Sequence, residues 1–171
     1  MLRLFNDIKS VSKRKPKKIR YLYESNFAGS LDNWEEVSGV FSLGHSQSFG
    51  GESNVLQIRA EAGVGKATLT SIKNLSALSS GDIVIGNDYE ISFRYAINSA
   101  NDEIIYVDNV QLGGASHTID TGAVSTDTWL SRSVTFTASS TGYQPFIRLN
   151  EDHESGVTDL VYFKDIKIRQ V

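Results

Sequence analysis

Three sets of residues in this sequence are of types that could do chemistry. The histidines His45, His117 and His153 stand far apart, and none of them has the spacing of a zinc site or a catalytic triad. The run Asp152-His153-Glu154 falls between two expected strands, where it is more typical of a hydrated turn than of a general base. The run Gly63-Val64-Gly65-Lys66 is shorter than a phosphate-binding loop, and no helical pattern follows it. We therefore expect no enzymatic activity, no metal and no cofactor.

The first twenty residues form a basic arm. They hold eight of the 17 Lys and Arg residues and one acid, Asp7, so their net charge is +7 (8 − 1), and residues 21–171 carry −10 (9 − 19). A solvated tail and a nucleic-acid-binding segment are two interpretations, but the acidic body would repel a polyanion. We favour a third, an arm that contacts a partner subunit. Its expected contact residues are Leu2, Leu4, Phe5, Ile8, Lys13, Arg14, Lys15, Lys17, Lys18 and Arg20.

Composition favours one folded domain that is rich in strands. The chain has 171 residues, 40% of them hydrophobic, and its two Trp, seven Tyr and eight Phe suffice for a substantial core. Fourteen Gly and two Pro favour short strands joined by turns. Cysteine is absent, which excludes disulfides and thiolate metal sites. No stretch is apolar enough to span a membrane or to serve as an export signal, so we expect a soluble protein.

The elements that would position functional side chains are strands. Apolar residues alternate with polar ones over 89–97, and similar alternation covers 55–60, 104–112 and 131–137. Further strands are expected over 128–138, 146–150 and 161–168, and the pattern slips near Lys164-Asp165, which indicates a bulge. We predict an all-β protein: a jelly-roll β-sandwich over residues 21–171, preceded by an extended basic N-terminal arm over residues 1–20.

The order of these segments resembles the carbohydrate-binding modules of the cellulase-associated families 4 and 9. The similarity begins with Asn26-Phe27-Ala28-Gly29 and Trp34, and continues through 88–93. Segments 54–60 and 66–72 would be paired strands, and Trp129, Phe136, Arg148 and Tyr162 complete the series. The resemblance covers residues 23–171 and implies a jelly roll that binds a glycan.

The resemblance also implies a structural calcium, held by a carboxylate near the first strand and an aspartate in the last. In this sequence the two positions are Ala28 and Lys164. Alanine has no side-chain oxygen, and an ammonium group would repel a dication that requires oxygen ligands. We therefore predict that this calcium is missing.

Glycan recognition in such folds implies aromatic rings that stack on sugar rings, together with polar groups that orient them. The candidate residues are Trp34, Arg94, Trp129, Tyr143 and Arg148. Tyr143, beside Gly142, is the ring that we expect to be most exposed, whereas Tyr95 is expected in the core and Trp129 as a structural plug. The outward strand faces are expected to be polar and to lack a row of rings: Ser92, Arg94, Ser133, Thr135, Thr137, Arg148 and Asn150.

Two functions fit these features. The first is a non-enzymatic virion structural protein of a bacteriophage, an auxiliary or decorating subunit of the capsid or tail. It would be made in the host cytoplasm, attach to other virion subunits through the basic arm, and display the sandwich. The alternative is a free-standing carbohydrate-binding module that recognises a polysaccharide. Neither function involves a membrane, and nucleic-acid binding ranks last.

Overall fold

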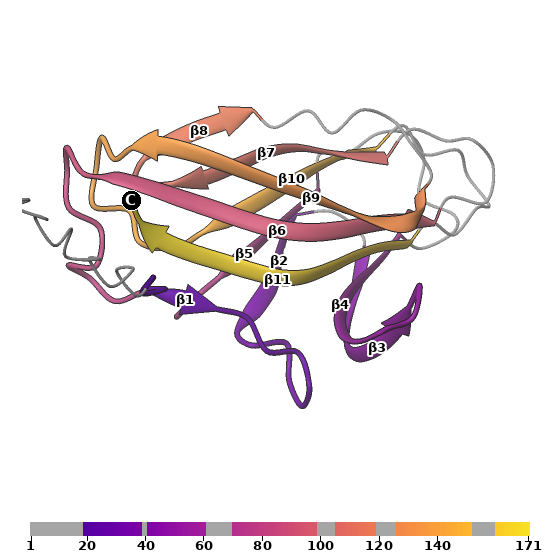
Figure 1. Cartoon of the computed structure of the whole chain (residues 1–171). Coiled ribbons are helices and arrows are strands. Elements are labelled where there is room, and N and C mark those ends of the chain that lie inside the picture. Colours follow the sequence, from indigo (N-terminus) through magenta and orange to yellow (C-terminus); the bar gives the residue numbers. More distant parts are fainter. Residues whose placement is uncertain (1–18, 39–40, 61–69, 99–104, 119–125, 152–159) are drawn as a thin grey trace, which may run out of the picture.

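The computed structural model shows two antiparallel sheets packed face to face, as the sequence predicts (Figure 1). It describes residues 19–38, 41–60, 70–98, 105–118, 126–151 and 160–171. The basic arm up to residue 18 and the runs 63–66 and 152–154 lie outside these ranges, so their predicted roles stay predictions. Within these ranges every regular element is a strand, and no helix is long and apolar enough to cross a membrane.

In the described part of the chain, eleven strands make up the two sheets. The six-stranded sheet has the order β3 (Phe41–Phe49), β4 (Glu52–Ala60), β11 (Leu160–Gln170), β6 (Asp88–Asn98) and β9 (Thr126–Thr137), and β1 (Tyr23–Glu24) also pairs with β11. The five-stranded sheet has the order β2 (Trp34–Ser38), β5 (Thr70–Asn74), β10 (Phe146–Glu151), β7 (Ile105–Leu112) and β8 (Ala115–Thr118).

The predicted pairing of segment 54–60 with segment 66–72 is wrong. Strand β4 pairs with β3 and β11, whereas β5 pairs with β2 and β10 in the other sheet. An alternating pattern shows that one face of a strand is buried, but both sheets of a sandwich bury one face. The pattern therefore does not say which sheet a strand joins.

The core lies between the sheets, where the strands alternate as expected. Along β6, Tyr89, Ile91, Phe93 and Tyr95 are almost completely buried, which confirms the core position predicted for Tyr95. The five-stranded sheet contributes inward side chains in the same way, among them Ile147 of β10. Burial of these apolar side chains is the main source of stability, at roughly 1.5–3 kcal/mol each.

A bulge interrupts β11 where the sequence predicts one. The register to β6 shifts between Lys164 and Lys167, and Asp165 has a φ of 54°, which is uncommon for a residue other than glycine. The backbone N–H of Ile166 donates to Ser25 Oγ at 3.0 Å, so a side chain replaces the lost ladder bond.

Candidate functional site

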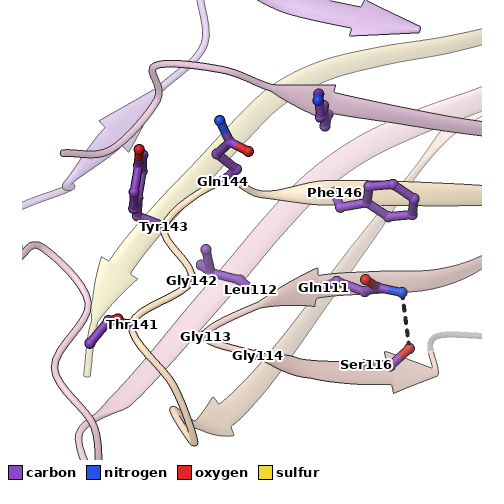
Figure 2. A pocket seen from close by; sticks show the side chains of 11 residues that line it. Gln111, Leu112, Gly113, Gly114, Ser116, Thr141, Gly142, Tyr143, Gln144 and Phe146 are labelled. Atoms are coloured by element: carbon purple, nitrogen blue, oxygen red, sulfur yellow. Dashed lines mark hydrogen bonds between the residues drawn. The ribbon is translucent and has the colours of Figure 1, made fainter. Parts of the chain in front are cut away.

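A groove of about 520 Å³ lies on the outer face of the five-stranded sheet (Figure 2). Its floor is formed by strands β5, β7, β8 and β10, and its rim by the loop that precedes β10. The residues that line it are Lys73, Gln111, Leu112, Gly113, Gly114, Ser116, Thr141, Gly142, Tyr143, Gln144 and Phe146.

A single row of cross-strand neighbours runs through this groove. Phe146 on the central strand is directly opposite Lys73 on one side and Gln111 on the other. The row continues to Glu35 of β2 beyond Lys73 and to Ser116 of β8 beyond Gln111. It thus takes one residue from every strand of the sheet. At about 4.8 Å between strands, the row is roughly 19 Å long.

The centre of the row is an aromatic ring that the core does not use. Phe146 alternates with the buried Ile147 on β10, so its ring projects away from the sandwich. It is half-buried and does not belong to either cluster of packed hydrophobic residues. A ring in this position offers an apolar surface on which a planar or sugar-like group can stack.

The two ends of the row have different polar chemistry. At one end Lys73 Nζ lies 3.2 Å from Glu35 Oε1, with both side chains partly exposed. At the other end Gln111 Nε2 donates to Ser116 Oγ at 3.4 Å (Figure 2). The ring is therefore flanked by an ion pair on one side and by an amide and a hydroxyl on the other, all groups that can hydrogen-bond a ligand.

The rim of the groove is fixed by backbone bonds between two loops. Gly113 N–H donates to the carbonyl of Gly142 at 2.9 Å, and the N–H of Ser140 donates to the carbonyl of Gly113 at 2.8 Å. Gly114 has a φ of 78°, and a Cβ there would overlap the Ser140 side chain. Tyr143 follows this contact and is half-buried, with its ring packed against the core. The loops therefore approach each other more closely than larger residues would allow.

Two of the five predicted glycan-binding residues lie on the face that carries the groove. Tyr143 lines the groove, and Arg148 lies two residues from Phe146 on the same outward side of β10. Trp34, by contrast, is only 2% exposed. Its Nε1 donates to the Tyr23 hydroxyl at 2.9 Å, and Asn74, completely buried, donates to the same hydroxyl. The proposed stacking role of Trp34 is therefore wrong, because its ring belongs to the core.

The other two, Arg94 and Trp129, lie on the outer face of the six-stranded sheet. Trp129 Nε1 donates to the carbonyl of Phe49 at 3.1 Å, and the Arg94 guanidinium lies 5.4 Å from the Trp129 ring centre. Phe49 belongs to β3 at one edge of the sheet and Trp129 to β9 at the other. The end of the curved β3–β4 hairpin must therefore cross the outer face (Figure 1).

Beneath this hairpin, aromatic and aliphatic side chains form a second small core. We call it the closed face cluster, and its members are Phe49, Val55, Ala96, Trp129, Leu160 and Tyr162. The rings of Phe49 and Tyr162 stack with their centres 4.2 Å apart. These contacts make Trp129 a structural residue, in agreement with its interpretation as a plug. Neither Arg94 nor Trp129 is close to the groove, since the whole sandwich separates the two outer faces.

Glu52, the first residue of β4, pairs with two cations on the same sheet. Lys164 Nζ lies 2.6 Å from Glu52 Oε2, and Arg94 donates to Glu52 Oε1 at 2.8 Å. Hydrogen bonds from Lys164, and secondly from Arg94, lower the pKa of Glu52. Each of the two cations thus has a carboxylate partner.

The positions expected to lack a calcium contain other contacts. The Lys164 ammonium also donates to the carbonyl of Ser53 at 3.1 Å, and the carbonyl of Ala28 accepts from Ser46 Oγ at 2.7 Å. Within the described ranges, no three His, Cys, Asp or Glu side chains form a group that could hold a metal. The absence of calcium stays a prediction, which these contacts make physically reasonable.

Phe146 is the main site residue that the sequence analysis missed. It occupies the same alternating position as Arg148 and Asn150, which were expected on the outward face, so the pattern of β10 contained the signal. The sequence contained no comparable sign that Lys73, Gln111 and Ser116 would lie at the site. Their place beside Phe146 depends on the register between strands that are far apart in sequence.

Several solved structures that share this fold are carbohydrate-binding modules. The C-terminal family 22 module of Clostridium thermocellum Xyn10B, in which conserved amino acids of a cleft have a role in ligand binding, is 16% identical. The match covers 88% of this chain and 92% of that one, with a TM-score of 0.60. The CBM22-1 xylan-binding domain of Paenibacillus barcinonensis Xyn10C is also 16% identical, covering 92% and 98%, with a TM-score of 0.59.

A bacteriophage protein shares the architecture as well. The enzymatically active domain of tailspike protein 4 of bacteriophage CBA120 matches 85% of this chain but only 20% of its own length. The identity is 11% and the TM-score 0.52. No protein-family model matches the sequence, and no curated protein sequence does.

These likenesses establish the fold of a carbohydrate-binding module. The two modules described above are of family 22, so the finer assignment to families 4 and 9 is not shown. A shared fold with part of a tailspike does not assign this chain to a virion, because one sandwich architecture carries many functions.

Proposed function

We propose that this protein is a non-catalytic carbohydrate-binding module that holds a polysaccharide chain across the five-stranded sheet. The observation that carries the proposal is the ring of Phe146, which projects from the middle of a row of polar residues and belongs to neither packed cluster of the described residues. One sugar ring would stack on Phe146, and neighbouring sugars would lie along the row.

The dimensions and polarity of the row suit such a ligand. A length of roughly 19 Å exceeds that of one sugar ring, so an extended chain fits better than a monosaccharide. Gln111 and Ser116 supply amide and hydroxyl groups that can bond to sugar hydroxyls. Xylan-binding domains with this fold support the same class of ligand.

The described residues of the groove do not supply the groups that glycoside hydrolysis requires. That reaction uses two carboxyl groups on either side of the glycosidic bond. The described residues that line the groove include no Asp or Glu, and Glu35 at the end of the row is already paired with Lys73. Binding without cleavage is therefore the function proposed.

The replacement Phe146→Ala tests this proposal. It should weaken binding to xylan or cello-oligosaccharides by about tenfold or more, measured by calorimetry or affinity electrophoresis, because stacking is lost. Thr135→Ala is the matched control, because Thr135 is exposed on the outer face of β9 in the other sheet. Equal binding by wild type and Phe146→Ala, or no binding to any member of a broad glycan panel, would refute the proposal.

A second candidate function is attachment to a virion as an auxiliary subunit, through residues 1–20. The observation that favours it is the division of charge, +7 in the arm and −10 in the body. A second groove, which Ile19, Arg20, Val84 and Val171 help to line, lies where the arm joins the body. Ile19, Val84 and Val171 are each at least half exposed there, so the surface could be covered by a partner.

Deleting residues 1–18 distinguishes this candidate from the first. The shortened chain should fold and bind glycan as before but should no longer be incorporated into particles when it is expressed during phage assembly. Charge-reversing Lys13, Arg14 and Lys15 should weaken incorporation in part. Unchanged incorporation of both variants would eliminate the arm as the means of attachment.

A further inference from the structure

Lys73 differs from the cations of the other sheet in what surrounds it. It is in direct register with the Phe146 ring and lines the groove. On the six-stranded sheet, Arg94 and Lys164 share Glu52, and Arg169 makes a two-pronged contact with Glu90 at 3.0 and 2.9 Å. Those cations are held by short contacts on the other sheet and do not line the groove around Phe146, whereas Lys73 faces the site of the proposed ligand.

The partner of Lys73 is placed so that it can be exchanged. Glu35 lies at the end of the row and does not line the groove, and its side chain is 43% exposed. The two charged atoms are 3.2 Å apart, with the Lys73 side chain 31% exposed. Exposed ion pairs contribute little to stability. Replacing the Glu35 carboxylate by an anionic group of a ligand would therefore cost little.

A cation lies beside the Phe146 ring although the body of the protein is acidic. Residues 21–171 have a net charge of −10 (9 − 19), which disfavours any approaching anion. One residue in direct register with the ring is nevertheless a cation, Lys73, which is paired with Glu35. Because salt screens charges beyond about 8 Å, a bound ligand responds mainly to these near groups.

We propose that the groove selects an anionic polysaccharide, with a sugar ring on Phe146 and an acidic group of the same chain on Lys73. This inference rests on the proposed function and names its ligand class. The acidic group takes the place of Glu35 as the partner of Lys73. A uronic-acid carboxylate and a sulfate ester are both anionic groups carried by sugar rings, and both can pair with an ammonium group.

The experiment compares glucuronoxylan with the same polymer after reduction of its carboxyl groups, and dextran sulfate with dextran. Wild type should bind the acidic member of at least one pair about tenfold more tightly than the neutral member. A preference in the xylan pair identifies a carboxylate, and one in the dextran pair identifies a sulfate. Equal affinity within both pairs would overturn the inference and leave the proposed function standing.

Two variants and one control assign the preference to Lys73. Lys73→Gln should remove the difference in affinity between the acidic and the neutral polymer, whatever its effect on the neutral polymer alone, and Glu35→Gln should increase affinity for the acidic polymer. Lys167→Gln, which removes a cation paired with Glu24 on the other sheet, should change neither. If Lys167→Gln weakens acidic binding as much as Lys73→Gln does, the attraction is unspecific and the inference fails. If no polymer binds at all, the proposed function itself fails.

Discussion

The outer faces of the two sheets carry similar residue types, but one face is crossed by the β3–β4 hairpin and the other carries the groove. On the six-stranded sheet the β3–β4 hairpin crosses the face, so that Phe49, Tyr162 and Trp129 pack together and Glu52 pairs with its cations. On the five-stranded sheet the ring of Phe146 and its polar neighbours face a groove. The difference teaches that an outward aromatic residue becomes structural or ligand-binding according to what covers it.

The largest effect that should separate the two faces is on stability. Tyr162→Ala removes a ring that is 4% exposed and stacked on Phe49, and should lower the free energy of unfolding by about 3 kcal/mol. Phe146→Ala should lower it by less than about 1 kcal/mol, because among the described residues its ring belongs to neither packed cluster. Chemical denaturation of both variants measures the difference. If both variants lose the same free energy of unfolding, the two rings are packed to the same extent and the comparison of the two faces fails.

Trp129 provides a test of intermediate size. Trp129→Ala should lower the free energy of unfolding by about 2 kcal/mol, because the half-buried ring and its bond to Phe49 are lost. Trp129→Phe keeps a ring and should recover part of that loss. Neither variant should change glycan affinity, as measured by calorimetry. Weaker binding by a folded Trp129→Phe protein would place a binding site on the closed face.

The ion pairs of Glu52 should make stability depend on pH. Because Lys164 and Arg94 lower the pKa of Glu52 in the folded state, these contacts stabilise the fold above the ordinary glutamate pKa of about 4.3. The stabilisation should decrease as the pH falls through the lower folded pKa. Wild type and Glu52→Gln should therefore differ in free energy of unfolding at neutral pH and converge in acid. Curves that stay a constant distance apart would show that the ionisation of Glu52 does not stabilise the fold.

The smallest expected effect is that of calcium. Excess calcium or a chelator should leave the melting temperature unchanged, since the Lys164 ammonium contacts Glu52 and Ser53 where a dication would need free oxygen ligands. Differential scanning fluorimetry in both conditions is sufficient, with magnesium as the control ion. A rise in melting temperature that is specific to calcium would contradict the prediction.

Much of the fold was predictable from local pattern. Alternation along 89–97 predicted the buried face of β6, and the slip at Lys164-Asp165 predicted the bulge in β11. These features depend on residues adjacent in sequence, because the side chains of a strand alternate between its two faces. The same pattern placed Arg148 on the outward side of β10, which is the side that Phe146 also occupies although the sequence analysis did not name it.

The candidate site was predictable only in part. Tyr143 and Arg148 lie on the face that carries the groove, but Trp34 is in the core and Arg94 and Trp129 lie on the opposite sheet. An aromatic residue beside a strand gives no local sign of whether another segment will cover it. The β3–β4 hairpin that contacts Trp129 is about eighty residues earlier in the chain.

The sequence by itself determined the all-strand character, the turns, the inward and outward sides of most strands, and the separation of a basic arm from an acidic body. Only the tertiary structure decided which strands share a sheet and which outer face stays open. It also aligned Glu35, Lys73, Phe146, Gln111 and Ser116 in one row. The physical reason is that alternation is set by the geometry of one strand, whereas register and coverage are set by contacts between strands distant in the chain.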